Sequence, residues 1–121
     1  MIIYMAAPVG APTVTEIRAN LARARRWLWW LRRTRPNDTI LCPWIADVEL
    51  ALDNQGDEKT GRANGLRDCE AIVSRCDGIA VCGGRMTDGM ARECGAFLRA
   101  TLGHGLVLDL LHLGQEPPEV A

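Results

Sequence analysis

Short apolar runs alternate with helical patterns along the chain. Four runs, at residues 1–6, 39–42, 78–82 and 106–111, are apolar with little alternation. Strands that are covered on both faces of a sheet have this pattern. The segments between the runs repeat their apolar residues at helical spacing. The order β-α-β-α-β-α-β therefore predicts a parallel sheet with helices on both faces.

Capping and breaking residues set the expected ends of the helices. Thr13 and Glu16 have the spacing of a capping box, and Pro36 disfavours a helix that continues beyond Arg35. The polar segment at residues 53–61 is expected to be a surface loop. Further helices are expected at residues 44–52, 66–76 and 88–102.

These elements predict an α/β fold in one three-layer domain over residues 1–113. A four- to five-stranded parallel sheet in the order 2-1-3-4 would be flavodoxin-like or Rossmann-like. Residues 114–121 contain two prolines and are expected to form a loosely ordered tail. In this strand order the topological switch lies between the first and third strands, and ligands bind at the carboxyl ends of the strands there. We therefore look for function in the loops at residues 7–12 and 83–89.

Charge and cysteine content narrow the classes of partner and compartment. The net charge is −1, although seven of the 14 basic residues are arginines at residues 18–35. Helical spacing spreads these arginines around a polar face, so nucleic-acid binding is the third-ranked hypothesis. The N-terminus lacks a signal-peptide pattern, and no apolar stretch is long enough for a membrane span. We expect a cytoplasmic protein with reduced thiols and no metal site, since no cysteine pair has CxxC spacing.

The segment from Gly83 to Glu93 contains the best candidate site residues. Its two adjacent glycines, Gly83 and Gly84, would let the backbone approach a ligand, and the following helix N-terminus attracts anions. Thr87 or Asp88 is the expected N-cap. An ordinary strand-to-helix turn is the alternative interpretation of this loop.

Glu93 lies in the second turn of that helix, among small residues. It shares a stripe with Phe97 and Ala100, where a carboxylate without a role is costly. The helix N-terminus is expected to keep Glu93 ionised at neutral pH. A solvent-facing glutamate is the alternative for Glu93, and core packing is the alternative for Tyr4, the only tyrosine.

Three segments together resemble the nucleoside 2-deoxyribosyltransferase family, which includes deoxynucleoside-monophosphate N-glycosidases. They are IIYMAAP around Tyr4, LRDCEAIVSRCDGIAV around Asp68, and TDGMARE at residues 87–93. The resemblance extends from about Met1 to Leu111. It implies that Glu93 is a nucleophile toward the anomeric carbon of the sugar. It also implies that Asp68 protonates the leaving base or positions the sugar, that Tyr4 orients the nucleophile, and that Thr87 binds a 5′-phosphate.

The expected function is cleavage or transfer of the N-glycosidic bond of a (deoxy)nucleoside or its 5′-monophosphate. A covalent glycosyl–glutamate intermediate would form, and no cofactor is expected. A non-catalytic module that binds a nucleotide or a nucleotide-derived signal is the alternative. The expected substrate-binding residues come from the two loops and comprise Ala7, Pro8, Gly83, Gly84, Arg85, Thr87, Asp88 and Gly89.

Three tryptophans on the first helix point to self-association. Trp27, Trp29 and Trp30 cannot all lie on one buried face, and exposed aromatic patches mark interfaces. We therefore expect a dimer or a dimer of dimers. Packing of the indoles over neighbouring loops is the alternative.

Overall fold

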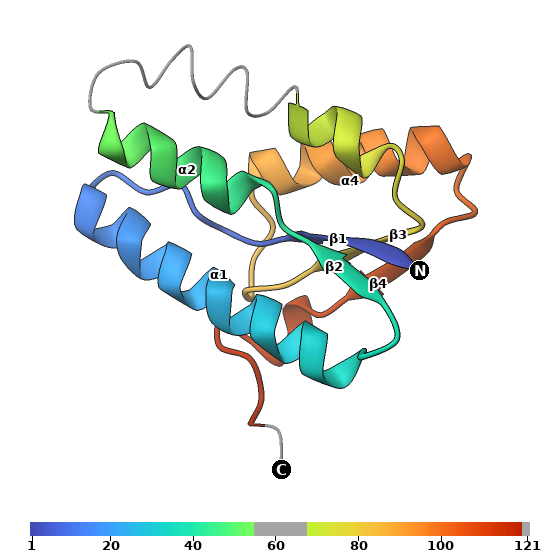
Figure 1. The fold of residues 1–121 in the computed structure, drawn as a ribbon, viewed down its shortest axis with the longest axis horizontal. Coiled ribbons are helices and arrows are strands. Elements are labelled where there is room, and N and C mark those ends of the chain that lie inside the picture. Colours follow the sequence, from blue (N-terminus) through green and yellow to red (C-terminus); the bar gives the residue numbers. More distant parts are fainter. Residues whose placement is uncertain (55–67, 120–121) are drawn as a thin grey trace.

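The computed structural model describes residues 1–54 and 68–119 and contains a parallel sheet of four strands in these ranges. The strand order is β2-β1-β3-β4, which confirms the predicted order and the α/β fold class (Figure 1). All three strand pairs are parallel. The strands are β1 (Ile2–Ala6), β2 (Thr39–Leu41), β3 (Gly78–Val81) and β4 (Leu106–Asp109).

Helices cover both faces of the sheet (Figure 1). α1 (Val14–Thr34) lies on one face, and α2 (Trp44–Asp53) and α4 (Asp88–Thr101) lie on the other. A helical segment at residues 68–73 lies beside α4. A short 3-10 helix, η1 (Leu111–Leu113), follows β4. Most of the loop expected at residues 53–61, and residues 66–67 of the expected third helix, fall outside the described ranges.

The ends of the helices follow the capping signals. The Thr13 hydroxyl accepts a hydrogen bond from the Glu16 amide at 3.2 Å, as its place in a capping box predicts. α1 ends at Thr34, so the chain leaves the helix before Pro36. None of the helices described is long and apolar enough to cross a membrane.

The two central strands form the middle of the core. Every residue of β3 is buried, as are the last four residues of β1. Tyr4 pairs with Leu41 on one side and with Ile79 on the other. Tyr4 therefore lies in the middle of β1, and its side chain is fully buried.

The chain after η1 is held against α1 rather than hanging free. The Trp27 indole N–H donates to the Gln115 carbonyl at 2.7 Å. The Glu116 carboxylate accepts from Arg23 and Arg26. The composition of the tail does not reveal these partners on α1, and the loose order expected for residues 114–121 stays a prediction.

Candidate active site

Two loops meet at the carboxyl edge of the sheet. Gly83, just after β3, has φ +99°, and a Cβ atom built there would lie 2.5 Å from Pro8 Cδ. Gly84 has φ +84°, and its Cβ would lie 3.0 Å from the Gln115 amide nitrogen. The glycines therefore bring this loop close to the chain's own backbone. In the structure the close approach is made to Pro8 and Gln115, and an approach to a ligand stays a prediction.

A small cavity lies between these loops and α1. Four of the expected substrate-binding residues line it: Ala7, Pro8, Gly83 and Arg85. Its volume is about 20 Å³, which has room for about one water molecule.

Further lining residues of this cavity were missed by the sequence analysis. They are Asn20, Arg23, Ala24, Trp27 and Gln115. The first four repeat at helical spacing on one face of α1, so the pattern was visible in the sequence. Its role could not be predicted, because nothing in the sequence shows that the C-terminal segment returns to α1.

Thr87 has a structural role at the start of α4. Its hydroxyl oxygen accepts from the Met90 amide at 3.3 Å, which makes Thr87 the N-cap. Asp88 is the first helical residue, and its side chain is exposed beside the positive end of the helix dipole. Gly89 follows in the same turn.

Glu93 faces the interior of the protein. Only 8% of its surface is exposed, and it is the only charged residue in the buried core among the described residues. The buried stripe of α4 comprises Met90, Glu93, Ala96 and Phe97. Ala100, which the helical spacing places on this stripe, is exposed. The alternative of a solvent-facing glutamate is therefore wrong.

The Glu93 carboxyl group and the Tyr4 hydroxyl lie together in this interior. The Tyr4 hydroxyl lowers the pKa of Glu93, and Glu93 raises the pKa of Tyr4, so the two groups interact directly. Neither Tyr4 Oη nor Glu93 Oε2 completes a hydrogen bond of ordinary geometry with any described residue. Buried polar atoms without partners are rare and usually have a functional reason. Apart from their interaction with each other, these two buried atoms therefore leave hydrogen-bonding capacity unused.

Burial controls the charge of Glu93. The pKa of this carboxyl group is raised from 4.5 to about 7, mainly by burial. The Tyr4 hydroxyl acts to lower the pKa, and the negative charge of Glu70 acts to raise it. Glu93 is therefore only about half ionised at neutral pH. This corrects the expectation of a fully ionised carboxylate: desolvation outweighs the helix dipole, which acts mainly in the first turn of a helix.

Tyr4 remains neutral beside it. Burial first, and then the charge of Glu93, raise the pKa of the Tyr4 hydroxyl far above its ordinary value. A neutral phenol is both a donor and an acceptor. The pair therefore combines a carboxyl group that titrates near pH 7 with a hydroxyl that can donate to its ionised form.

Two further side chains extend this cluster. The Cys69 thiol interacts with Tyr4 and lies 4.0 Å from Asp47 Oδ2 of α2. Burial raises the pKa of Cys69 to about 11; the Tyr4 hydroxyl opposes the shift, and the charges of Glu93, Asp47 and Asp68 add to it. Sequence analysis missed Cys69 and Asp47, although Cys69 directly follows Asp68.

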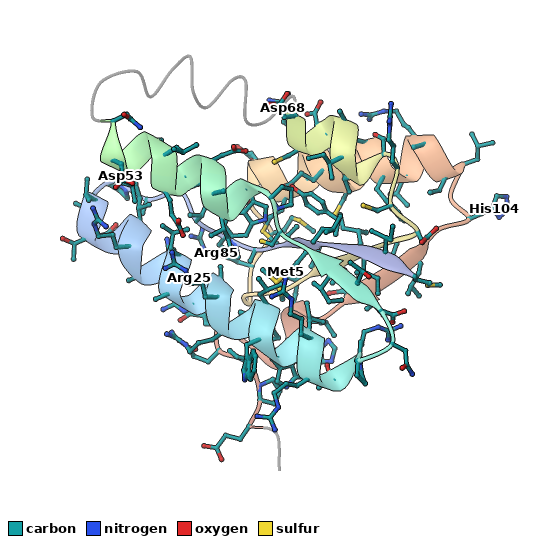
Figure 2. All side chains as sticks on the ribbon, viewed as in Figure 1. Met5, Arg25, Asp53, Asp68, Arg85 and His104 are labelled. Carbon is teal, nitrogen blue, oxygen red and sulfur yellow. The ribbon has the colours of Figure 1, made fainter. Side chains whose placement is uncertain are left out.

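Asp68 occupies the outer end of the helix at residues 68–73 (Figure 2). Its side chain is exposed, in contrast to those of Glu93 and Tyr4. The three expected catalytic residues are thus brought toward one face of the sheet from three elements. Tyr4 and Glu93 are in mutual contact, and Asp68 is linked to them through the charge that it places near Cys69.

Thiols form part of the wall around the buried carboxyl group. Burial raises the pKa of Cys42 well above its ordinary value and that of Cys82 to about 12, so both are neutral. All five cysteines are free thiols. Within residues 1–54 and 68–119, no group of three or more His, Cys, Asp or Glu side chains could hold a metal ion.

Comparison with known proteins adds no assignment. No family model, curated protein or solved structure matches this chain significantly.

Proposed function

We propose that this protein cleaves or transfers the N-glycosidic bond of a nucleoside or nucleoside 5′-monophosphate, with Glu93 as the nucleophile. The observation that carries the proposal is the buried Glu93 carboxyl group, unpartnered at Oε2 and facing the unpartnered Tyr4 hydroxyl. It lies beside the switch between β1 and β3, where open parallel sheets bind ligands. The resemblance of three segments to the deoxyribosyltransferase family supports the same assignment.

The reaction would proceed in two displacement steps. The ionised Glu93 oxygen forms a bond to the anomeric carbon as the bond to the base nitrogen breaks, and the base leaves with a proton for which Asp68 is the expected donor. A water or a second base then forms a bond to the same carbon, releases Glu93 and gives up its proton. A carboxylate suits this task because the transition state is positively charged at the sugar.

Tyr4 would position the nucleophile. Its neutral hydroxyl can donate to one Glu93 oxygen and leave the other free for the sugar. The hydroxyl lowers the pKa of Glu93, which favours the ionised, reactive form.

A binding module without turnover is the second candidate function. It is favoured by the pKa of Glu93, which is about 7. A carboxyl group that is half protonated can donate a hydrogen bond to a base as well as accept one. The Glu93–Tyr4 pair could then recognise a nucleotide without reacting with it.

Base release from a panel of nucleosides and their 5′-monophosphates separates these functions. We expect the wild-type protein to release free base from at least one member, and Glu93→Gln to lose about three orders of magnitude or more in rate. Glu49→Gln is the matched control, because Glu49 is an exposed glutamate that pairs with Arg25 on the helix surface. Binding of a panel member without base release supports the second candidate. Equal release by wild type and Glu93→Gln refutes the first.

A further inference from the structure

Arg23 and Arg26 of α1 bind the carboxylate of Glu116, near the C-terminal end of the chain. Arg26 binds both oxygens of Glu116, with Nε to Oε2 at 2.9 Å and a terminal nitrogen to Oε1 at 2.7 Å. Arg23 Nε donates to the same Oε1 at 3.1 Å. These contacts hold the pKa of Glu116 at about 2. A forked arginine contact with two oxygens is also the geometry with which proteins bind phosphate.

Arg23 is fixed in place without Glu116. Its terminal nitrogen donates to Asn20 Oδ1 at 3.1 Å, and the Asn20 amide donates to the Val9 carbonyl at 3.0 Å. The loop after β1 therefore sets the direction of this guanidinium. An arginine that is positioned by the protein loses less freedom when an anion binds, which favours binding.

The same arginine lines the cavity at the carboxyl edge of the sheet. Arg85, from the loop after β3, also lines it, and no described residue forms an ion pair or hydrogen bond with Arg85. Two cations thus meet at the switch between β1 and β3, where ligands of such sheets bind. One of them has no acidic partner among the described residues, so this end of the cavity lacks negative charge.

The C-terminal segment fills the rest of this space. Gln115 lines the cavity and packs against Gly84, and its carbonyl accepts from Trp27. With this segment in place the cavity has a volume of only about 20 Å³. Glu116 itself is about half exposed, so its carboxylate can exchange with solvent anions while Gln115 stays anchored.

We propose that Arg23, Arg26 and Arg85 form a binding site for a phosphate group, which Glu116 occupies as an internal competitor. A phosphate monoester carries the same planar pairs of oxygens as the Glu116 carboxylate, and more negative charge. Glu116 leaves the arginines when such a ligand binds. The site includes Arg85, one of the expected substrate-binding residues, but it goes beyond the proposed function because it is built on arginines of α1 and does not involve Glu93 or Tyr4.

Titration calorimetry with inorganic phosphate at fixed ionic strength tests the site. An attached competitor has a high effective concentration, so removing its charge should strengthen phosphate binding. We expect Glu116→Gln to bind phosphate at least about tenfold more tightly than wild type. Glu119→Gln is the matched control: it removes the same charge from the same exposed segment, and Glu119 has no arginine contact among the described residues.

The double variant Arg23→Gln/Glu116→Gln should lose the increase in phosphate affinity that Glu116→Gln shows. Thermal melting checks that the double variant folds. A parallel titration with a nucleoside 5′-monophosphate distinguishes a free phosphate ligand from a phosphate ester. The proposal is overturned if Glu116→Gln and Glu119→Gln shift the affinity equally, because net charge alone would then explain the effect. It is also overturned if Glu116→Gln gives no gain. Neither result depends on base release, so the site can fail while the proposed function stands.

Discussion

Glu93 is a carboxyl group whose ionisation the fold opposes. Only 8% of its surface is exposed, and its Oε2 atom has no partner among the described residues. Removing such a group from water without a compensating hydrogen bond costs free energy. The cost appears as a pKa near 7. At the scale of the residue, the site is a buried carboxyl group that gains and loses its proton near neutral pH.

This burial makes stability depend on pH. The folded-state pKa of Glu93 is about 7 and the unfolded value is 4.5, so the folded state binds the proton more tightly. The resulting stability is fully present below pH 4.5 and is lost as the pH rises through 7, by about 3 kcal/mol at most. We expect Glu93→Gln to lose less stability than wild type between pH 5 and pH 8 (about the range that brackets the transition). Chemical denaturation at both pH values measures this difference, and identical slopes for the two proteins would contradict it.

The neighbours of Glu93 should tune its pKa in opposite directions. The Tyr4 hydroxyl lowers the pKa and the charge of Glu70 raises it. Tyr4→Phe should therefore move the rising limb of the pH–rate profile to higher pH, and Glu70→Gln should move it to lower pH. Tyr4→Phe should change stability by about 1 kcal/mol or less, the usual net contribution of one hydroxyl interaction. Profiles that shift in the same direction would show that Glu93 is not the titrating group.

At the scale of the elements, the loop after β3 is fitted to its neighbours. Gly83→Ala combines an unfavourable φ with a clash against Pro8, because the added Cβ would lie 2.5 Å from Cδ. Gly103→Ala is a matched control with φ +77° and no heavy atom within 4 Å. We expect Gly103→Ala to cost about 1 kcal/mol and Gly83→Ala at least about 2 kcal/mol in the free energy of unfolding. Equal losses would mean that the two loops are not held in contact.

The order and capping of the elements were predictable because they depend on local sequence. Apolar runs, Thr13 and Pro36 specify strands and helix ends through contacts within a few residues. The anchoring of Gln115 and Glu116 was not predictable, because it depends on Trp27, Arg23 and Arg26 some 90 positions away. The pKa of Glu93 was missed for a similar reason: burial there results from the packing of three elements, whereas the helix dipole is a local effect.

At the scale of the whole molecule, the tryptophans divide between core and surface. Trp27 is fully buried and makes an edge contact with Trp30 at 5.6 Å between ring centroids. Trp29 is 63% exposed, with the Arg33 guanidinium 6.0 Å from its ring centroid. The expected self-association therefore depends on Trp29 and the exposed part of Trp30, a smaller patch than three indoles.

Self-association through this patch stays a prediction. We expect light scattering at tens of micromolar (about the range in which modest interfaces form) to give a dimer or a dimer of dimers. Trp29→Ser should lower the mass toward that of the monomer. Leu98→Ser, which removes an exposed apolar side chain from α4, should leave the mass unchanged. A wild-type mass of one chain would contradict the prediction.

The most direct test of the central claim is the mass of the protein after reaction with a nucleoside fluorinated at C2′ of the sugar. Fluorine there destabilises the positively charged transition state and slows the second displacement, so a covalent intermediate accumulates. The account predicts that wild type gains the mass of one sugar, located by fragmentation on Glu93, and that Glu93→Gln gains none. An added mass on another residue, or base release with no adduct on Glu93, would contradict the assignment of Glu93 as the nucleophile.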